Sequence, residues 1–150
     1  MALIQVETTR EIAAPAEKVY AAIADLASRA QWLPENFSDY AVEGDGCPGS
    51  VLRYRLKVGP RERQYRMQTT ATAPGSAIRE QDSTSSLQST WTVTPSGNTS
   101  KVHIATQWQG SGGMGGFFER LFAPAGLKKV YDAELTRLDA YIAGTAPPAA

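Results

Sequence analysis

The chain has 150 residues, of which 42% are hydrophobic and 20% are charged, and its 15 Lys and Arg residues balance its 15 Asp and Glu residues. This is the composition of an ordinary globular domain with a core of its own, and it excludes a disordered chain. Without a net charge there is no overall field to collect nucleic acid, so we expect no nucleic-acid partner. One cysteine and one histidine cannot supply an internal disulfide or a zinc cluster, so we expect neither a metal nor a cofactor.

The N-terminal residues lack the basic segment and apolar run of a secretory signal. No stretch approaches the ~20 apolar residues that a membrane-spanning helix needs. We therefore expect a cytoplasmic protein without stable membrane insertion.

The first predicted elements are a strand and two short helices. Residues 3–12 alternate in polarity, which predicts a half-buried strand. Pro15 suits the first turn of a helix, and Val19, Ile23 and Leu26 follow it at helical spacing. A second short helix is expected over residues 28–32, ending before Pro34 because the residue before proline avoids the helical conformation.

Six further strands are predicted over residues 37–43, 50–58, 62–72, 77–82, 86–94 and 100–109. Short turns rich in Gly, Pro and Ser separate them, and turns of this length join antiparallel neighbours. Alternation within the strands gives one apolar and aromatic face and one polar face. This pattern predicts an antiparallel sheet that is covered on one side only.

The C-terminal part is predicted to be a glycine-rich link over residues 110–116 and a helix that begins near Phe117. Pro124 and Gly126 are expected to kink or break this helix. From Leu127 onward one apolar stripe continues at helical spacing. The chain is thus predicted to be a single α+β domain over residues 1–144 with a flexible tail over residues 145–150.

The order of these elements, together with Ala14-Pro15, Val19-Tyr20, Asp25 and Trp32 before Pro34, resembles the helix-grip fold. This is the START-domain and birch-pollen-allergen superfamily (SRPBCC), and the chain is most similar to its polyketide cyclase/dehydrase and lipid-transport branch. The resemblance covers about Ile4 to Ile142. It implies a curved sheet of about seven strands around the long C-terminal helix, with a cavity between them for small hydrophobic molecules. No residue set matches a particular cyclase site, so no catalytic residue is assigned.

The candidate ligand-binding residues share the apolar face of the predicted sheet or follow the glycine-rich link. They are Arg10, Tyr54, Tyr65, Met67, Glu80, Ser89, Trp91, Ile104, Thr106, Trp108, Phe118 and Phe122. Pockets for small molecules combine an apolar lining with a few polar groups, as this set does. The alternative is that the same side chains simply fill a core.

Two charged residues in this set raise a sharper hypothesis, in which Arg10 or Glu80 orients a polar group of the ligand. In the alternative, strand ends place both side chains in water. The bulky segment 117–122 either lines the pocket mouth, contacts a partner or membrane surface, or packs on the sheet. His103 shares its phase with Lys101 and should face solvent, and Cys47 lies in a turn without a base beside it.

Basic residues gather on adjoining strands and are interpreted as a solvated outer face: Arg53, Arg55, Lys57, Arg61, Arg63 and Arg66. The preferred function is binding of a small hydrophobic or amphipathic molecule in the cavity, for carriage or sensing. The first alternative is a polyketide aromatase/cyclase or dehydratase. The second is a module that binds a protein partner or a membrane.

Overall fold

The computed structural model describes residues 3–109 and 124–144. In chain order the elements are β1 (Leu3–Ile12), α1 (Ala16–Ala24), the 3-10 turn η1 (Ala27–Gln31), β2 (Phe37–Glu43), β3 (Val51–Val58), β4 (Arg61–Ala73), β5 (Ala77–Asp82), β6 (Gln88–Ser96), β7 (Thr99–Gln109) and α3 (Pro124–Ala143). The predicted strands agree with the observed ones to within two residues at each end.

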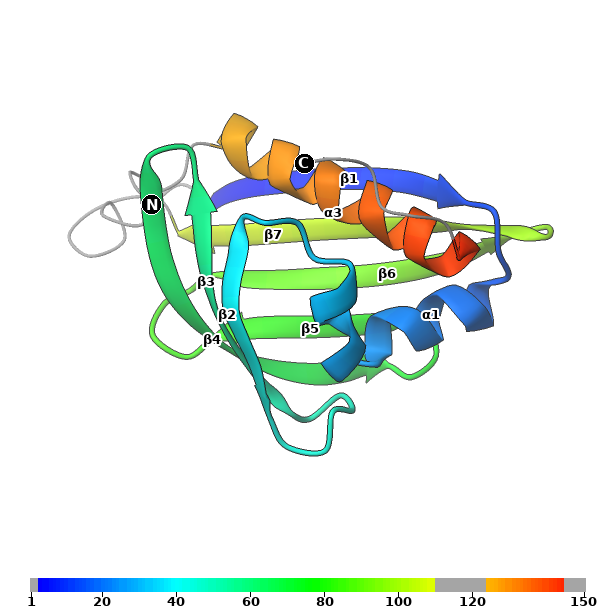
Figure 1. Cartoon of the computed structure of the whole chain (residues 1–150), viewed down its shortest axis with the longest axis horizontal. Helices are drawn as coiled ribbons and strands as arrows, with labels where there is room; N and C mark the ends of the chain where they lie inside the picture. The colour runs from blue at the N-terminus through cyan, green and yellow to red at the C-terminus, as the bar shows by residue number, and fades with distance from the viewer. Residues whose placement is uncertain (1–2, 110–123, 145–150) are drawn as a thin grey trace.

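All strands belong to one seven-stranded sheet in the order β1-β7-β6-β5-β4-β3-β2. Every neighbouring pair is antiparallel. Strands β2 to β7 each pair with the next strand in the chain, and β1 pairs with the last strand, β7. Figure 1 shows that the sheet curves and that α1 and α3 lie on the same side of it. The predicted α+β helix-grip architecture is therefore confirmed.

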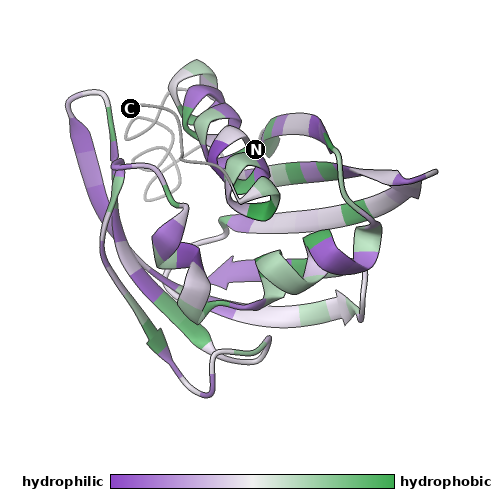
Figure 2. Cartoon of the chain, turned by 45° about the vertical axis from the view of Figure 1, so that its right-hand side comes forward, coloured by the Kyte–Doolittle hydropathy of each residue, from purple (hydrophilic) through white to green (hydrophobic). Residues whose placement is uncertain are grey.

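The core lies between the concave face of the sheet and the helices. Side chains at alternate positions of the strands are buried there, including Leu52, Met67, Ile78 and Ile104, none of which is more than 1% exposed. Figure 2 shows hydrophobic and hydrophilic bands following one another along the strands and along the helices. The period-two pattern predicted these faces because only one side of the sheet is covered.

Helix α3 is fastened to the edge strand β1 by polar contacts. Thr8 donates a hydrogen bond to Asp132, and Arg10 binds Asp139 at 3.0 Å and the Thr136 hydroxyl at 3.2 Å. Arg10 thus lies on the covered face of β1, as the alternation of the strand predicted, and its guanidinium binds α3.

The described part of the C-terminal helix begins at Pro124 and runs through Gly126 without a break. The predicted interruption at Gly126 was therefore wrong. A methyl group at this position would come within 2.9 Å of the Cγ1 atom of Val58, so the missing side chain lets the helix approach β3 closely. The predicted start near Phe117, the glycine-rich link and the tail lie outside the described residues.

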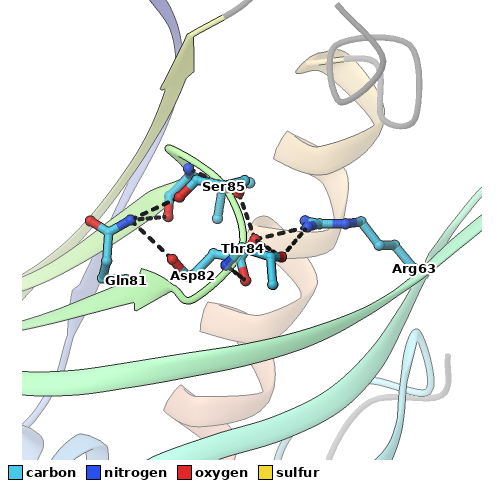
Figure 3. A network of polar contacts seen from close by, with 6 residues as sticks. Arg63, Gln81, Asp82, Thr84 and Ser85 are labelled. Carbon is cyan, nitrogen blue, oxygen red and sulfur yellow. Dashed lines mark hydrogen bonds and ion pairs between the residues drawn. The ribbon is translucent and has the colours of Figure 1, made fainter. Parts of the chain in front are cut away.

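A compact polar network closes the turn between β5 and β6 (Figure 3). Arg63 on β4 reaches Asp82 at 2.8 Å and Thr84 at 3.2 Å, and the Ser85 hydroxyl donates to Asp82 at 2.5 Å. The Arg63 side chain is only 12% exposed. Its assignment to the basic outer face was wrong, because its odd position on β4 turns it inward like the buried residues of that strand.

The other basic residues of the outer face lie among acidic neighbours. Arg53 and Arg66 both bind Glu43, at 2.6 and 3.2 Å, and Arg55 binds Glu62 at 3.1 Å. This side of the sheet is therefore a solvated, charge-balanced surface. None of the helices in the described ranges combines the length and the apolar character that crossing a bilayer demands.

Candidate functional site

A small cavity lies between the concave face of the sheet and α3. Its volume is about 30 Å³. It takes about 10–15 Å³ to hold a water molecule, so the space corresponds to roughly two waters. Ligand pockets commonly measure about 300–1,000 Å³, so the interior of this conformation is largely filled by side chains.

The structure divides the candidate ligand-binding residues into three groups. Those that line the cavity are Tyr54, Glu80, Ser89, Trp91 and Ile104. Those that are buried on the same face but do not line this cavity are Tyr65, Met67, Thr106 and Trp108. Arg10 lies at the contact between β1 and α3, and Phe118 and Phe122 lie outside the described residues.

A buried ion pair forms one wall of the cavity. Arg29 projects from η1 and its Nη1 atom lies 2.6 Å from Oε2 of Glu80 on β5, with the two side chains only 3% and 6% exposed. The Arg29 Nε–H donates to the carbonyl of Ile23 at 3.1 Å, and the guanidinium lies 5.1 Å from the centre of the Trp91 ring. Burial alone would lower the pKa of Arg29, but the Glu80 carboxylate beside it raises that pKa, so the guanidinium stays charged.

One nitrogen of this guanidinium lacks a hydrogen-bond partner in the described ranges. Nη2 of Arg29 is buried and has no hydrogen-bond partner among the residues that the structure describes. Buried polar groups are nearly always paired, so this unpaired guanidinium nitrogen is unusual, as are the indole nitrogens of Trp32 and Trp108, which also have no hydrogen-bond partner among the described residues.

A second carboxyl group enters the cavity from the helix. Glu134 of α3 is 3% exposed, and within the described ranges its side chain makes no hydrogen bond. Burial raises the pKa of Glu134 to about 8, with Arg29 lowering it and the Glu80 carboxylate raising it further. At neutral pH Glu134 is therefore mostly protonated and can donate a hydrogen bond.

Tyrosine hydroxyls complete the polar part of the wall. Burial raises the pKa of Tyr54, Tyr40 and Tyr131 above the ordinary value, so each hydroxyl is neutral. Tyr40 donates to the carbonyl of Leu26 at 2.7 Å. Tyr54 has no hydrogen-bond partner in the part of the chain that the structure describes.

The hydroxyl of Tyr131 belongs to a separate chain of hydrogen bonds. It lies 2.5 Å from the Thr106 hydroxyl, which lies 2.6 Å from that of Ser89. The register of the sheet sets this row, because Ser89 pairs with both Glu80 and Thr106 on neighbouring strands. These hydroxyls satisfy one another, whereas Arg29, Glu134 and Tyr54 each have polar atoms without a hydrogen-bond partner among residues 3–109 and 124–144.

The remaining chemical candidates lie away from the cavity. His103 sits on the outer face, where its Nε2 atom lies 3.0 Å from Oε1 of Glu7. Cys47 is exposed in the turn before β3. Within residues 3–109 and 124–144 there is no cluster of three or more potential ligands that could hold a metal ion.

Sequence reasoning missed Arg29, Tyr40 and Glu134. Glu134 could have been found, because it falls at helical spacing within the buried stripe that contains Tyr131 and Leu138. Arg29 carried no such signal, since its burial depends on a partner 51 positions away.

Comparisons with known proteins agree with this architecture. Residues 4–143 match the family described as polyketide cyclase/dehydrase and lipid transport. The solution structure of the KanY protein is 35% identical, with a TM-score of 0.84 over 96% of this chain and 100% of that one. No curated protein matches the chain significantly.

More distant structures share the fold. The Zhui aromatase/cyclase from Streptomyces sp. R1128 has a TM-score of 0.75 at 15% identity, over 97% of this chain and 100% of that one. A START superfamily protein from Mycobacterium smegmatis has a TM-score of 0.62 at 18% identity, over 93% of this chain and 94% of that one. At these identities the likeness extends to the fold alone.

Proposed function

The chain belongs to the polyketide cyclase/dehydrase and lipid-transport family, and we propose that it binds a small amphipathic molecule in the cavity between its sheet and α3. The observation that carries the proposal is a wall that combines apolar side chains with the buried polar groups of Arg29, Glu80 and Glu134. Such groups are costly to bury without partners, which favours a bound molecule that supplies some of them.

The size of the cavity sets a condition on this function. A space of about 30 Å³ cannot hold an organic ligand without movement of the wall. Part of the wall is only half-buried, namely Leu33, Phe37, Tyr40 and Tyr54. Displacing these side chains outward enlarges the cavity without disturbing the fully buried core.

Native mass spectrometry of the protein after exposure to a cell extract tests the proposal. We expect a retained small molecule on the wild-type protein. We expect it to be absent from Leu33→Trp, in which a larger side chain occupies the outer part of the wall. An empty wild-type protein, or equal loading of the two proteins, would contradict the proposal. A co-purifying polypeptide on an empty protein would favour the interaction module instead.

One observation favours a second function, which is proton transfer in a cyclisation or dehydration. Glu134 is buried beside an ion pair and has a pKa raised by burial to about 8, and general acids and bases work best with pKa values near the working pH. In an intramolecular aldol condensation the attacking carbon loses a proton, forms a C–C bond to the carbonyl carbon, and the carbonyl oxygen takes up a proton. Loss of a second proton from the attacking carbon and of the new hydroxyl group then releases water and leaves a C=C bond, and the protein would assist these proton transfers.

Incubation with a short linear triketone separates the two functions. A carrier returns the probe unchanged, whereas an enzyme produces a cyclic compound that is lighter by one water. Loss of this product in Glu134→Gln, with retention in the exposed control Glu17→Gln, would support the enzyme. The same rate without protein would reject it.

A further inference from the structure

The turn between β3 and β4 carries basic side chains on both faces of the hairpin. Lys57 and Arg61 flank the Gly59-Pro60 turn, and both side chains are exposed. Lys57 belongs to the outer row of β3, whereas Arg61 lies opposite Val58 in the register and so shares the face that α3 covers. Within the described ranges neither of them forms an ion pair, in contrast to the arginines farther from the turn. The tip of the hairpin is therefore a cationic spot on a chain that has no net charge.

Helix α3 brings a further cation to the same end of the molecule. Gly126 packs against Val58, so the first described turn of α3 lies beside the tip of the hairpin (Figure 1). Lys129 follows on the helix, is exposed, and lines the groove between the helix and the hairpin. It forms no ion pair with residues 3–109 or 124–144, whereas its neighbour Lys128 binds Asp132 at 3.3 Å. Two separate elements thus place cations around one groove.

The groove itself is mainly apolar. Its volume is about 330 Å³, against about 30 Å³ for the internal cavity. Two polar residues and four apolar residues or glycines line it: Asn36, Lys129, Val58, Gly59, Gly126 and Val130. An apolar groove with a cationic rim is complementary to the surface of an anionic bilayer, in which negative headgroups cover apolar chains.

The acids at this end of the molecule do not cancel the positive charge. Glu62 lies opposite Lys57 in the register, but its carboxylate binds Arg55 at 3.1 Å. Glu35 is exposed beside the groove residue Asn36 and has no ion-pair partner in the described ranges, so it offsets one of the three cations. A net charge of about two positive units remains around the groove.

The opposite end of the molecule is balanced by comparison. Helix α1 lies far from the β3–β4 turn (Figure 1), and there Glu17 is followed directly by Lys18. Glu11 on β1 pairs in the register with Lys101 on β7. The excess positive charge is thus concentrated at the β3–β4 turn. Because exposed charges act over a Debye length of about 8–10 Å, this end is the one that a negatively charged surface attracts.

We propose that the β3–β4 turn and the adjoining part of α3 form a docking surface for membranes that contain anionic phospholipids. Lys57, Arg61 and Lys129 are the side chains that contact the headgroup phosphates. The attachment is electrostatic and reversible, because none of the described helices can cross a bilayer and no large apolar side chain of this end is exposed among the described residues.

The docking surface lies next to the internal cavity. Asn36 and Val130 line the groove, and the residues that follow them in the chain, Phe37 and Tyr131, line the cavity. Docking therefore brings the cavity close to the bilayer. The surface is a property of the exposed end of the molecule and goes beyond the proposed binding function, so it holds whether or not the cavity is occupied.

Cosedimentation with lipid vesicles tests the proposal. One set of vesicles is pure phosphatidylcholine, and the other is a two-to-one mixture of phosphatidylcholine and phosphatidylglycerol. Each cation near an anionic membrane strengthens binding about fivefold, so two net charges predict about 25-fold stronger partitioning of the wild-type protein to the anionic vesicles. This preference should decrease as the salt concentration rises, because salt screens exposed charges.

Neutralising the cations locates the surface. The site variant combines three substitutions and should lose the preference for anionic vesicles: Lys57→Gln, Arg61→Gln and Lys129→Gln. The matched control removes the same charge from exposed positions elsewhere and should keep most of the preference: Lys18→Gln, Arg79→Gln and Lys101→Gln. Circular dichroism checks that both variants are folded. Lys129→Gln alone is the second variant, and it should reduce the preference about fivefold.

The remaining outcomes would overturn the proposal. Equal partitioning of the wild-type protein to both kinds of vesicle, or equal losses in the site variant and the matched control, would show that this end is not a membrane surface. Polyglutamate serves as a soluble acidic probe in the same buffer. If the wild-type protein bound polyglutamate but showed no preference between the vesicles, the cations would serve an acidic protein instead of a membrane.

Discussion

Replacing Glu134 by glutamine provides the most direct measurement of how far the cavity is isolated from water. Burial raises the pKa of this carboxyl group from 4.5 to about 8 in the folded protein. Between these pH values the folded protein keeps a proton on Glu134 that the unfolded chain releases. The contribution of Glu134 to the free energy of unfolding is therefore fully present below pH 4.5 and is lost as the pH rises towards 8.

The magnitude follows from the size of the shift. Each pH unit in this window lowers the free energy of unfolding by about 1.4 kcal/mol, so the loss at pH 7 is about 3 kcal/mol. Glutamine has the shape of the protonated carboxyl group and cannot ionise. The stability of E134Q relative to the wild type should thus increase by roughly 3 kcal/mol between pH 5 and pH 7 and level off above pH 8.

Urea denaturation of both proteins at each pH, followed by tryptophan fluorescence, measures this difference. Every other titrating group is common to the two proteins, so its contribution cancels. Glu17→Gln, at an exposed position of α1, is the control and should show no such trend. A constant difference between E134Q and the wild type would refute the reasoning. A decreasing difference would mean that Glu134 is ionised and paired with Arg29 instead.

Three further predictions concern buried contacts of the fold. Arg29→Met alone leaves Glu80 buried without its 2.6 Å partner and should cost about 3–5 kcal/mol in urea denaturation, most of it recovered when Glu80→Met is added; a mild effect of the single change would show that the pair is solvated. Replacing glycine by alanine in a helix normally raises the free energy of unfolding by about 1 kcal/mol, but Gly126→Ala should not, because its methyl group meets Val58. The gain should appear when Val58→Ala makes room for the methyl group, and urea denaturation of the two single variants and the double variant measures it. Additive effects of the two substitutions on the free energy of unfolding would contradict this prediction. Thr106→Val breaks a buried chain of hydroxyls and should lower the free energy of unfolding by about 1–3 kcal/mol by calorimetry, and an unchanged melting temperature would mean that water replaces the hydroxyl.

The strands could be predicted from the sequence because their information is local. Alternation, glycine and proline identify each strand and its covered face, and the short turns leave antiparallel pairing as the only outcome. The same local logic placed Glu80, Ser89 and Trp91 on the face that lines the cavity. The family resemblance supplied the position of the long helix relative to the sheet.

The chemistry of the site could not be predicted in the same way, because it depends on contacts between distant segments. Thr8 and Asp132 are 124 positions apart, and Arg29 and Glu80 are 51 apart. A lone charged residue in a short helical turn is usually solvated, so nothing local indicates that Arg29 is buried. The break predicted at Gly126 was wrong for a related reason. Glycine lowers helix propensity, but here the missing side chain makes room for Val58, which is distant in the sequence.

The positions of these long-range contacts also decide which wall of the cavity can move. Helix α3 is held at β1 by the bonds of Arg10 to Asp139 and Thr136, and at β3 it packs closely through Gly126. The opposite wall is weaker, because it includes the half-buried Phe37 on the edge strand β2.

Strand β2 also has an irregular register between Ser38 and Ala41, where Asp39 adopts a φ of 54° that is unfavourable for a residue other than glycine. Enlargement of the cavity should therefore begin at β2 and leave the contact between β1 and α3 in place. When the protein is titrated with a small amphipathic probe such as acetophenone in ¹H–¹⁵N NMR experiments, amide shifts should be largest around Phe37 and Tyr40 and smallest around Thr8 and Arg10. The reverse pattern would show that the cavity opens by movement of α3 away from β1, and would contradict this prediction.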